Sequence, residues 1–480
     1  MSERPRYNPR LPGGADVAKR IDWHELSRRA GPAFLAFALL TWAWAWKRGA
    51  DREPPDLYPF LKRAWPGASY LPQAGGRFFE VRREGEIVGY ATTGTASGYG
   101  GPLTLAVGAA PDGRIRDLAL LEYRDTPDLM RGSGKLLGSL LGKAPADAFE
   151  VGRDVDAVTG ATFSSRGIAL AARQAVGTIA ERGAARPTGG RAPVQFGAPE
   201  IVLLLLLAAG AVGRNRPSLA PRTRRILRAG TLLVSLVGLG FLWNRPWTIA
   251  FPTRLLAGDW PAWPTHLYWY ILLGGVLAAF TRTGKNSYCP WICPFGAAQD
   301  VLGLLGGARK RRLPSALLFT WVKRVLLWLA VLLGLLYRAP GAASFEVFAA
   351  FFRLSGTGFQ LAILALVLVT AVFFSRPFCN WTCPVDTTEH VARYFRVRAL
   401  RLVGREAGLP RVRRPILLAA APADRPPVPV FRRVRNGLLT AAGVLSALLV
   451  LGHLHERFSA LGRGSQEGLL GRTYTSAERR

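Results

Sequence analysis

The stretch DAVTGATFSS, residues 156–165, marks the point where a strand-like sequence changes to a helical one. Upstream, residues 85–94 and 103–123 hold β-branched and apolar runs, and a Pro-Asp-Gly turn divides the second of them, which predicts a small antiparallel sheet. Downstream, residues 164–185 carry apolar side chains at helical spacing as far as Gly183. The sequence therefore predicts an α+β domain in which this stretch connects the sheet to a helix.

The stretch itself combines small and hydroxyl side chains. Gly160 and Ala161 predict a tight turn with a small profile, which allows a bulky group to approach the backbone. Ser164 or Ser165 is expected to cap the following helix. A polar turn followed by a helix cap is a sufficient explanation for the tetrapeptide TGAT taken alone, because such short sequences are common.

Long apolar runs dominate the rest of the chain, which has 480 residues, 49% of them hydrophobic, and a net charge of +32. The basic residues lie in blocks between these runs and form no stripe with interleaved aromatic side chains, so nucleic-acid binding is not expected. The runs predict a helical protein that crosses membrane lipid seven times, with flanking Trp, Tyr and Arg extending the shorter runs. The predicted spans are Pro32–Trp46, Pro199–Gly213, Ile226–Trp243, His266–Phe280, Val325–Tyr337, Phe359–Phe374 and Leu438–Leu454.

The fifth run is the least regular of the seven. Lys323 and Arg324 interrupt an apolar stretch that begins at Leu317. Both side chains are long enough to extend to the membrane interface, so the span is expected to begin after them.

Basic clusters alternate between successive loops. They lie at residues 214–225, 282–312 and 376–433, whereas the loops between them hold few Lys or Arg. Because Lys and Arg remain on the cytoplasmic side, the N-terminus is predicted to be cytoplasmic and residues 48–198 extracytoplasmic. No small-residue cleavage site follows the first run, which is therefore expected to be an uncleaved anchor in the inner membrane of a bacterial cell.

These features predict a multi-span α-helical membrane protein with an inserted extracytoplasmic α+β domain. A change of composition marks each expected boundary, with a linker rich in Gly, Pro and Arg before the second span. The expected segments are an N-terminus and first anchor at 1–47, the α+β domain at 48–185, a linker at 186–198, a six-span core at 199–455 and a C-terminal tail at 456–480.

The four cysteines of the chain fall in two similar sequences, CPWICPFG with Cys289 and Cys293 and CNWTCPVD with Cys379 and Cys383. Both read C-x-x-x-C-P after an apolar run, which predicts a quasi-twofold repeat that brings four thiolates together on the cytoplasmic side. A structural disulfide is not expected in that reducing compartment. Four thiolates suit an iron–sulfur cluster or zinc, while redox-active thiols and buried structural thiols are further interpretations.

Other cofactor and catalytic motifs are weak. No two of the five histidines are expected to face each other in the middle of two spans, so haem b is disfavoured. His266 and His390, at the edges of spans, suit either quinone proton chemistry or an ordinary interfacial position. The sequence has no P-loop, dinucleotide fingerprint or Ser-His-Asp pattern.

The segment from Asp156 to Thr162 resembles the flavinylation motif of FMN-binding domains in the NosR, NqrC and RnfG group. The resemblance implies that a flavin transferase esterifies an FMN phosphate to Thr162, with Asp156 and Thr159 as recognition residues and Gly160 and Ala161 beside the attachment point. Two upstream segments are similar to those that line the isoalloxazine pocket in that group. The first contributes Gly98, Tyr99, Gly100 and Gly101, and the second contributes Asp125, Thr126 and Pro127. In the second segment the family often has Glu-Thr-Pro-Gly, whereas this chain has Asp-Thr-Pro-Asp.

Paired C-x-x-x-C-P motifs in a multi-span core resemble those of NosR, NirI and PceC-like (CprC-like) proteins, so the resemblance extends from residue 80 to residue 390. That core is described as 4Fe-4S-binding, which implies a 4Fe-4S cluster with the four cysteines as ligands. NosR-type proteins continue into Cys-rich ferredoxin modules, but no cysteine follows Cys383 here. The layout is closer to the PceC or CprC type and implies a separate cytoplasmic electron donor.

The sequence thus predicts a membrane-bound electron-transfer flavoprotein, an oxidoreductase-type component. It is expected to pass electrons between the cysteine centre and a covalent extracytoplasmic FMN and then to a periplasmic acceptor, with a quinone or a cytoplasmic protein as donor. One alternative is a membrane redox sensor or maturation factor of the NosR type without sustained turnover. Another is a transporter in which the α+β domain is incidental.

Overall fold

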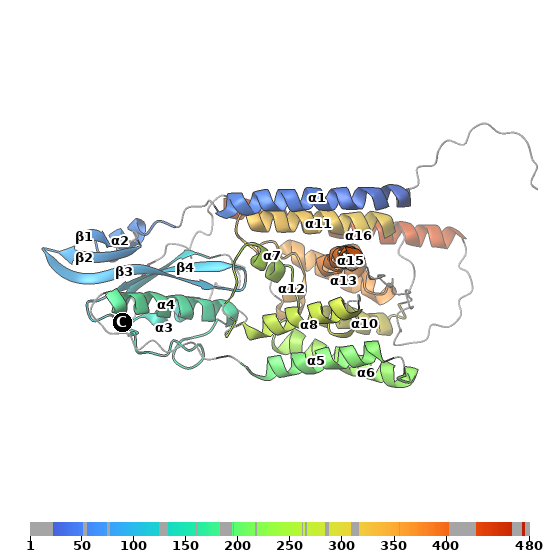
Figure 1. The fold of residues 1–480 in the computed structure, drawn as a ribbon, viewed down its shortest axis with the longest axis horizontal. Coiled ribbons are helices and arrows are strands. Elements are labelled where there is room, and N and C mark those ends of the chain that lie inside the picture. Colours follow the sequence, from blue (N-terminus) through green and yellow to red (C-terminus); the bar gives the residue numbers. More distant parts are fainter. Residues whose placement is uncertain are drawn as a thin grey trace, which may run out of the picture.

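The computed structural model describes residues 23–50, 55–73, 77–123, 133–158, 162–182, 194, 196–216, 218–261, 263–264, 266–283, 288–308, 316–354, 356–402, 429–462 and 473–475. These residues form two parts, an α+β domain and a larger helical part (Figure 1). In Figure 1 the α+β domain lies at one end of the long helices.

A fully antiparallel sheet forms the centre of the α+β domain, with strand order β1-β2-β3-β4-β5-β6. The turn between β4 and β5 contains the Pro-Asp-Gly sequence at 111–113, so the small antiparallel sheet expected there is confirmed. The strands are β1 Ser69–Gln73, β2 Phe78–Arg83, β3 Glu86–Ser97, β4 Pro102–Ala109, β5 Ile115–Glu122 and β6 Thr473–Thr475.

Helices cover both faces of this sheet. Side chains alternate between the two faces along β4. Leu103 and Leu105 face the long helix α4 (Thr162–Arg182) and the shorter α3 (Ser133–Leu140), and Ala106 faces the other side of the sheet. On that second face, α2 (Tyr58–Ala64) and Trp65 complete a smaller core. The domain therefore has three layers, and α4 ends at Arg182, just before Gly183 as the sequence predicts.

The remaining helices form the helical part. In chain order they are α1 Trp23–Ala50, α5 Ala198–Asn215, α6 Pro221–Val234 with its π-helical continuation η2 Ser235–Leu242, α7 Ala250–Leu256, α8 Leu267–Thr283, α9 Tyr288–Trp291, α10 Pro294–Leu305, α11 Ala316–Leu336, α12 Phe348–Arg353, α13 Gly358–Phe373, α14 Pro377–Trp381, α15 Pro384–Leu402 and α16 Pro429–Gly462. The main packing pairs are α1 with α11, α5 with α8, α10 with α13, and α13 with α16. In Figure 1, α1 and α11 run side by side along the length of this part.

All seven apolar runs predicted from the sequence lie on helices. Within the described ranges, three helices are long and apolar enough to cross a membrane, namely Pro221–Leu242, Ala316–Leu336 and Arg433–Ser459, and Leu267–Thr281 and Gly358–Phe373 are shorter apolar helices. Large apolar side chains on these helices face outward, among them Leu438, Val369 and Phe373. A mainly helical membrane protein with an α+β insertion is thus the fold that the sequence predicts.

Two features differ from the sequence-based expectation. Helix α11 begins at Ala316 rather than after Arg324, because Lys323 is buried (8% exposed) inside a continuous helix instead of ending it. Residues 473–475, expected to belong to a tail, form β6 and pair with β5. The chain therefore returns after α16 to the side of the α+β domain.

Close packing of α4 on β3 depends on Gly94. A Cβ atom at this position would lie 1.9 Å from the Ala171 carbonyl oxygen of α4. We expect Gly94→Ala to push the helix off the sheet and to lower the stability of the domain by about 1–3 kcal/mol. Thermal unfolding of the full chain, followed by tryptophan fluorescence, measures this loss.

The matched control is Gly177→Ala on the same helix, since a Cβ there meets no atom within 4 Å. Helix propensity predicts an unchanged or slightly higher melting temperature for this variant. Equal melting temperatures for the two variants would show that the helix–sheet contact is not tight.

Candidate functional site

The α+β domain docks on the helical part through the Gly-rich loop between β3 and β4. Arg254 of α7, which is 4% exposed, donates from Nη1 to the Gly98 carbonyl oxygen at 2.5 Å and from Nε to Asp259 Oδ2 at 2.6 Å. Ser97 donates from Oγ to Asp259 Oδ1 at 2.9 Å, so both ends of the Arg254–Asp259 pair bind this loop. Buried and paired charges of this kind fix the position of a backbone segment.

A second docking contact joins two glycines. The Gly341 amide donates to the Gly100 carbonyl oxygen at 2.5 Å, and a Cβ at Gly341 would lie 2.3 Å from Gly100 Cα. The loop is closed on itself by the Gly98 amide, which donates to the Gly101 carbonyl oxygen at 2.9 Å, and Gly101 has a φ of 148°. Only residues without side chains allow backbones to approach this closely.

The N-terminus of α4 makes the third docking contact. Phe163 packs against Trp269 and His266, with ring centroids 6.1 and 5.9 Å apart, and the Arg245 guanidinium lies 4.9 Å from the Phe163 centroid. Arg245 also pairs with Glu200 of α5 at 3.0 Å. The first turn of α4 is therefore held against the helical part by both stacking and a cation–π contact.

These contacts enclose a cavity of about 360 Å³, which we call the interdomain cavity. From the α+β domain it is lined by Tyr99, Thr162, Phe163, Ser164 and Arg166. The helical part contributes Pro199, Leu242, Trp243, Asn244, Arg245, Pro246, Thr248, Gly341, Ser344, Glu346, Phe348, Ala349, Arg353, Gln360, His453 and Arg457. Its volume lies in the range of small-molecule and cofactor sites.

Several predicted flavin residues meet at this cavity. Tyr99 and Thr162 line it, and the flanking Gly98 and Gly100 are held by the docking contacts described above. Asp156 lies elsewhere, with an exposed side chain on an open groove beside Ser139, whose Oγ accepts the Asp156 amide hydrogen at 3.0 Å. Thr159, Gly160, Ala161, Asp125, Thr126 and Pro127 lie outside the described residues.

The two serines after Thr162 do not cap the helix. Helix α4 begins at Thr162, so Ser164 and Ser165 lie within its first turn. The Ser165 hydroxyl accepts the Val158 amide hydrogen at 3.1 Å and thereby ties the preceding loop to the helix. The expectation of a serine cap was wrong because the helix starts earlier than the apolar spacing indicated.

The cavity wall also holds functional groups that sequence reasoning missed. Arg245, Arg353 and Arg457 come from separate segments of the helical part and face the cavity with Arg166 of α4. Glu346 is buried in the loop between α11 and α12, where its carboxylate accepts hydrogen bonds from the Ser344 hydroxyl and the Ile249 amide at 2.6 Å each. Desolvation outweighs these hydrogen bonds and raises the pKa of Glu346 to about 7. No linear spacing connects these residues, so the sequence held no signal for them.

The two cysteine motifs share one local structure. In the first, the Tyr288 carbonyl accepts both the Ile292 and Cys293 amides, at 2.7 and 2.9 Å. In the second, the Phe378 carbonyl accepts the corresponding Thr382 and Cys383 amides, at 3.1 and 3.0 Å. Each motif is a single helical turn whose second cysteine precedes a proline at the start of the next helix, α10 or α15. This repetition agrees with the quasi-twofold relation predicted from the sequence.

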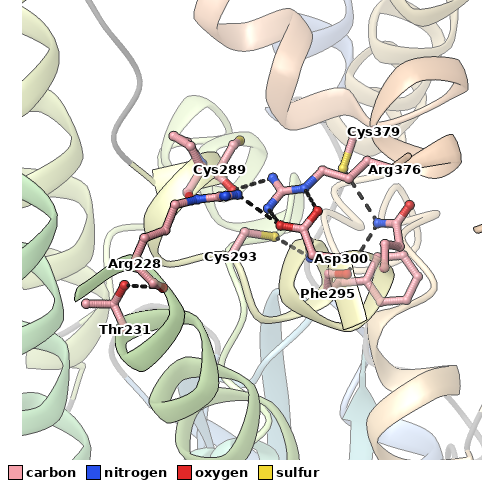
Figure 2. A network of polar contacts seen from close by, with 11 residues as sticks. Arg228, Thr231, Cys289, Cys293, Phe295, Asp300, Arg376 and Cys379 are labelled. Atoms are coloured by element: carbon pink, nitrogen blue, oxygen red, sulfur yellow. Dashed lines mark hydrogen bonds and ion pairs between the residues drawn. The ribbon is translucent and has the colours of Figure 1, made fainter. Parts of the chain in front are cut away.

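Asp300 of α10 braces the two motifs against each other (Figure 2). Its carboxylate accepts from Arg376 Nε at 2.8 Å, from Arg376 Nη2 at 2.7 Å and from Arg228 Nη2 at 2.9 Å. Arg376 Nη1 in turn donates to the Cys289 carbonyl at 2.8 Å, and Arg228 Nε donates to the Pro290 carbonyl at 3.0 Å. The residue before the second motif is thus locked to the backbone of the first.

Hydrogen-bond donors also face the sulfur atoms. The Gly296 amide, at the start of α10, donates to Cys293 Sγ at 3.4 Å, and Gln299 Nε2 donates to Cys379 Sγ at 3.6 Å. Gln299 Oε1 accepts the Phe378 amide at 3.1 Å, which gives a second bridge between the motifs. Donors and a nearby guanidinium fit thiolates that carry negative charge, as cluster ligands do.

The sulfur atoms are not arranged around one ion. Among the described residues, no three His, Cys, Asp or Glu side chains are close enough together to hold a single metal ion. In a four-iron cluster each thiolate binds a different iron, which requires wider spacing than four ligands on one zinc. The four cysteines supply the kind of thiolate ligands that a 4Fe-4S cluster uses.

The cysteine motifs reach into the interior of the helical part. Tyr288 Oη accepts the Trp247 amide at 2.7 Å, next to the cavity-lining Thr248. Phe348, another residue of the cavity wall, packs on Phe295 at 5.4 Å and on Phe378 at 6.2 Å between ring centroids. Phe295 follows the first motif and Phe378 begins the second, so ring contacts link the wall of the interdomain cavity to residues beside both cysteine motifs.

Comparison with known families matches both sites. An FMN-binding domain model matches residues 98–177, and a 4Fe-4S binding domain model matches residues 265–313 and 358–402, which include all four cysteines. These matches support FMN and an iron–sulfur cluster as the cofactors of a flavoprotein that resembles NosR and NirI.

Individual relatives cover parts of the chain. Protein NirI of Paracoccus denitrificans is 29% identical over 195 residues, 38% of this chain and 28% of its own length. Regulatory protein NosR of Pseudomonas aeruginosa is 30% identical over 202 residues, 38% of this chain and 27% of its own. A component of the proton-translocating ferredoxin:NAD(+) oxidoreductase complex of Clostridium ljungdahlii is 28% identical over 107 residues, 21% of this chain and 57% of its own. The chain thus spans under a third of NirI or NosR.

The Asp300 bridge generates a prediction for the cysteine site. In Asp300→Asn the Arg228 and Arg376 guanidiniums, with side chains 13% and 16% exposed, lose the one carboxylate they share. Breaking a buried ion pair costs about 3–5 kcal/mol, so we expect a lower melting temperature and reduced iron per chain. Iron and acid-labile sulfide analysis of the purified protein measures the second effect.

The exposed pair Arg153–Glu150 supplies the control. Glu150→Gln breaks an ion pair whose side chains are 75% and 50% exposed, and surface pairs contribute about 0–1 kcal/mol. Iron content should match the wild type in this variant. An Asp300→Asn protein with full iron and an unchanged melting temperature would show that the bridge does not hold the motifs.

Proposed function

We propose that this chain is a membrane electron-transfer protein in which FMN, esterified to Thr162, occupies the interdomain cavity and a 4Fe-4S cluster is bound by Cys289, Cys293, Cys379 and Cys383. Phe348 is the observation that carries the proposal, because its ring lines the cavity and packs on the rings beside both cysteine motifs. When bound, the flavin and the cluster supply the redox chemistry. The chain positions them and excludes water between them.

The surroundings of Thr162 support a phosphoester at this residue. Thr162 is the first residue of the 21-residue helix α4, whose free amide groups favour a phosphate. Arg166, one turn further along α4, and Arg245 line the same cavity, and each lies within the electrostatic field of the other. Burial and the neighbouring Arg245 charge lower the pKa of Arg166, and the Glu200 charge partly opposes this effect. A bound phosphate would therefore offset an excess of positive charge around Arg166.

The open groove around Asp156 supports a separate role for that residue. Asp156 lies outside the interdomain cavity, on the groove lined by Ser139, Gly142, Asp154 and Ala157. A flavin transferase could contact this exposed side of the motif while Thr162 faces the cavity. We assign Asp156 and Thr159 to transferase recognition, and Gly160 and Ala161 to the close approach of the flavin phosphate.

The distribution of basic residues supports the orientation of the protein. The basic clusters at 214–225 and 282–312 support an orientation in which the helix ends remote from the α+β domain face the cytoplasm of a bacterial cell, since Lys and Arg stay on that side of the inner membrane. The α+β domain then faces the periplasm. Electrons from a cytoplasmic or quinone donor would pass through the cysteine centre to the flavin and on to a periplasmic acceptor.

A redox sensor would need the same two centres, and two of the relatives bear the name regulatory protein. The relative from Clostridium ljungdahlii is named as part of an oxidoreductase complex. The continuous contact between the cavity and the cysteine motifs favours electron transfer. Repeated turnover with a reduced donor and a periplasmic acceptor distinguishes transfer from sensing, because a sensor would react once and stop.

The attachment point gives a direct prediction. Thr162→Val keeps the side-chain shape but removes the hydroxyl, so protein produced with the flavin transferase should lose all flavin fluorescence that survives denaturing gel electrophoresis. Mass spectrometry of the wild-type peptide that contains Thr162 should show the mass of FMN less one water.

Thr178→Val on the same helix is the control, because the Thr178 hydroxyl is exposed and bonds only to the Gln174 carbonyl within the described structure. This variant should retain its flavin. Covalent flavin in the Thr162→Val protein, or none in the wild type, would contradict the assignment.

A further inference from the structure

One part of the wall of the interdomain cavity, which we call the polar end, is formed by residues of the helical part. Arg353 ends α12, His453 lies on α16, and Gln360 and Glu346 lie between them. None of these residues belongs to the segment that matches the FMN-binding domain, which ends at residue 177. The polar end is therefore a feature of the helical part.

Two buried nitrogen atoms at this end have no hydrogen bond of normal geometry within the described part of the chain. His453 is 2% exposed, and neither its Nε2 nor the buried Nε of Arg353 has a partner of normal geometry among the described residues. The His453 ring also lies near the Ser344 backbone. Buried donors without partners cost about 1–3 kcal/mol each, so their retention in a cavity wall indicates a ligand that accepts hydrogen bonds.

The neighbours of His453 determine which ring nitrogen carries the hydrogen. Thr357 Oγ1 lies 2.9 Å from His453 Nδ1 and already accepts the Gln360 amide at 3.3 Å in the capping box of α13. The Thr357 hydroxyl is thus free to donate to Nδ1. In the neutral tautomer that accepts this hydrogen bond at Nδ1, the ring hydrogen is on Nε2, which is then a donor.

The charge of the cavity also favours an electron-rich ligand. Its wall holds the guanidiniums of Arg166, Arg245, Arg353 and Arg457, and Glu346 is its only acidic residue within the described structure. Arg245 is paired with Glu200 outside the wall. Arg166 on α4 and the neighbouring Arg245 suit a phosphate at Thr162, whereas Arg353 comes from a different element, α12.

The volume limits the occupant to one group of cofactor size. About 360 Å³ is near the lower end of the range for ligand sites, so one flavin fills the cavity and leaves no room for a second ligand beside it. We infer that Arg353 and His453 bind the pyrimidine edge of the isoalloxazine, around N1 and the C2 carbonyl, so that the helical part completes the flavin site and sets its midpoint potential.

This inference rests on the proposed attachment of FMN to Thr162. When bound, the flavin would supply the redox chemistry, since its oxidised ring can take up two electrons and one proton to give an anionic reduced form. The negative charge develops at N1 and the C2 oxygen. A guanidinium and an imidazole N–H at that edge stabilise the reduced form more than the oxidised form and so raise the potential.

The test is a redox titration of the purified, flavin-loaded full chain, followed by flavin absorbance. In Arg353→Gln the ratio of reduced to oxidised flavin at a fixed ambient potential should fall about tenfold or more, because a hydrogen bond to a charged group is lost. Arg353→Lys keeps the charge and should retain most of the wild-type ratio. His453→Leu, which removes the second donor independently, should shift the ratio in the same direction.

Lys62→Gln is the control, since it removes one positive charge from an exposed site on α2, on the face of the sheet opposite α4. Its ratio should equal that of the wild type. If Arg353→Gln and His453→Leu carry covalent flavin and show the wild-type ratio, the inference is wrong while the attachment at Thr162 stands. If the Arg353 variants fail to fold, the His453→Leu titration alone decides.

Discussion

The close approach of Gly341 to Gly100 is the contact on which the rest of the site depends. It brings the backbone of the Gly-rich loop against the loop that follows α11, and no side chain fits between them. Arg254 and Asp259 then fix the adjacent residues, and Phe163 packs against Trp269. The interdomain cavity exists only because these contacts hold Thr162 over the end of the helical part.

A second constraint acts at the cysteine motifs. Two short helical turns, far apart in the sequence, are joined by Asp300 and Gln299 of α10, which reach across to Arg376 and Phe378. The bridge leaves the motifs packed in the interior, where Phe295 and Phe378 meet the cavity-lining Phe348. Docking of the α+β domain closes the interdomain cavity over Phe348, and bracing of the motifs holds Phe295 and Phe378 against the same ring.

Much of this architecture could be predicted from the sequence. Period-two and period-3.6 patterns placed the strands and α4, hydropathy placed the seven runs on helices, and C-x-x-x-C-P repeated twice indicated a paired site. Such patterns can be recognised in the sequence because each depends on residues that are close together along the chain. The start of α11 was missed, since a charged residue such as Lys323 can be buried in a helix when tertiary packing allows it.

The wall of the interdomain cavity could not be predicted. Glu346, Arg353 and His453 come from three segments that meet only after the helices pack, and no spacing in the chain relates them to Thr162. The same is true of Asp300, which is an isolated acid in the sequence and a bridge between motifs in the structure. A site assembled by long-range packing has no recognisable residue spacing in the sequence, whereas a site built on a single turn, such as a cysteine motif, has one.

Transfer of electrons from the cysteine centre to the flavin is the central claim, and sealed vesicles provide its most direct measurement. The flavin-loaded chain is inserted with the α+β domain inside, a reductant that cannot cross the membrane is added outside, and flavin absorbance is followed per mole of covalent flavin. The account predicts rapid bleaching in the wild type and bleaching only at the rate of background leakage in Cys289→Ala. Equal rates in the two proteins would contradict it.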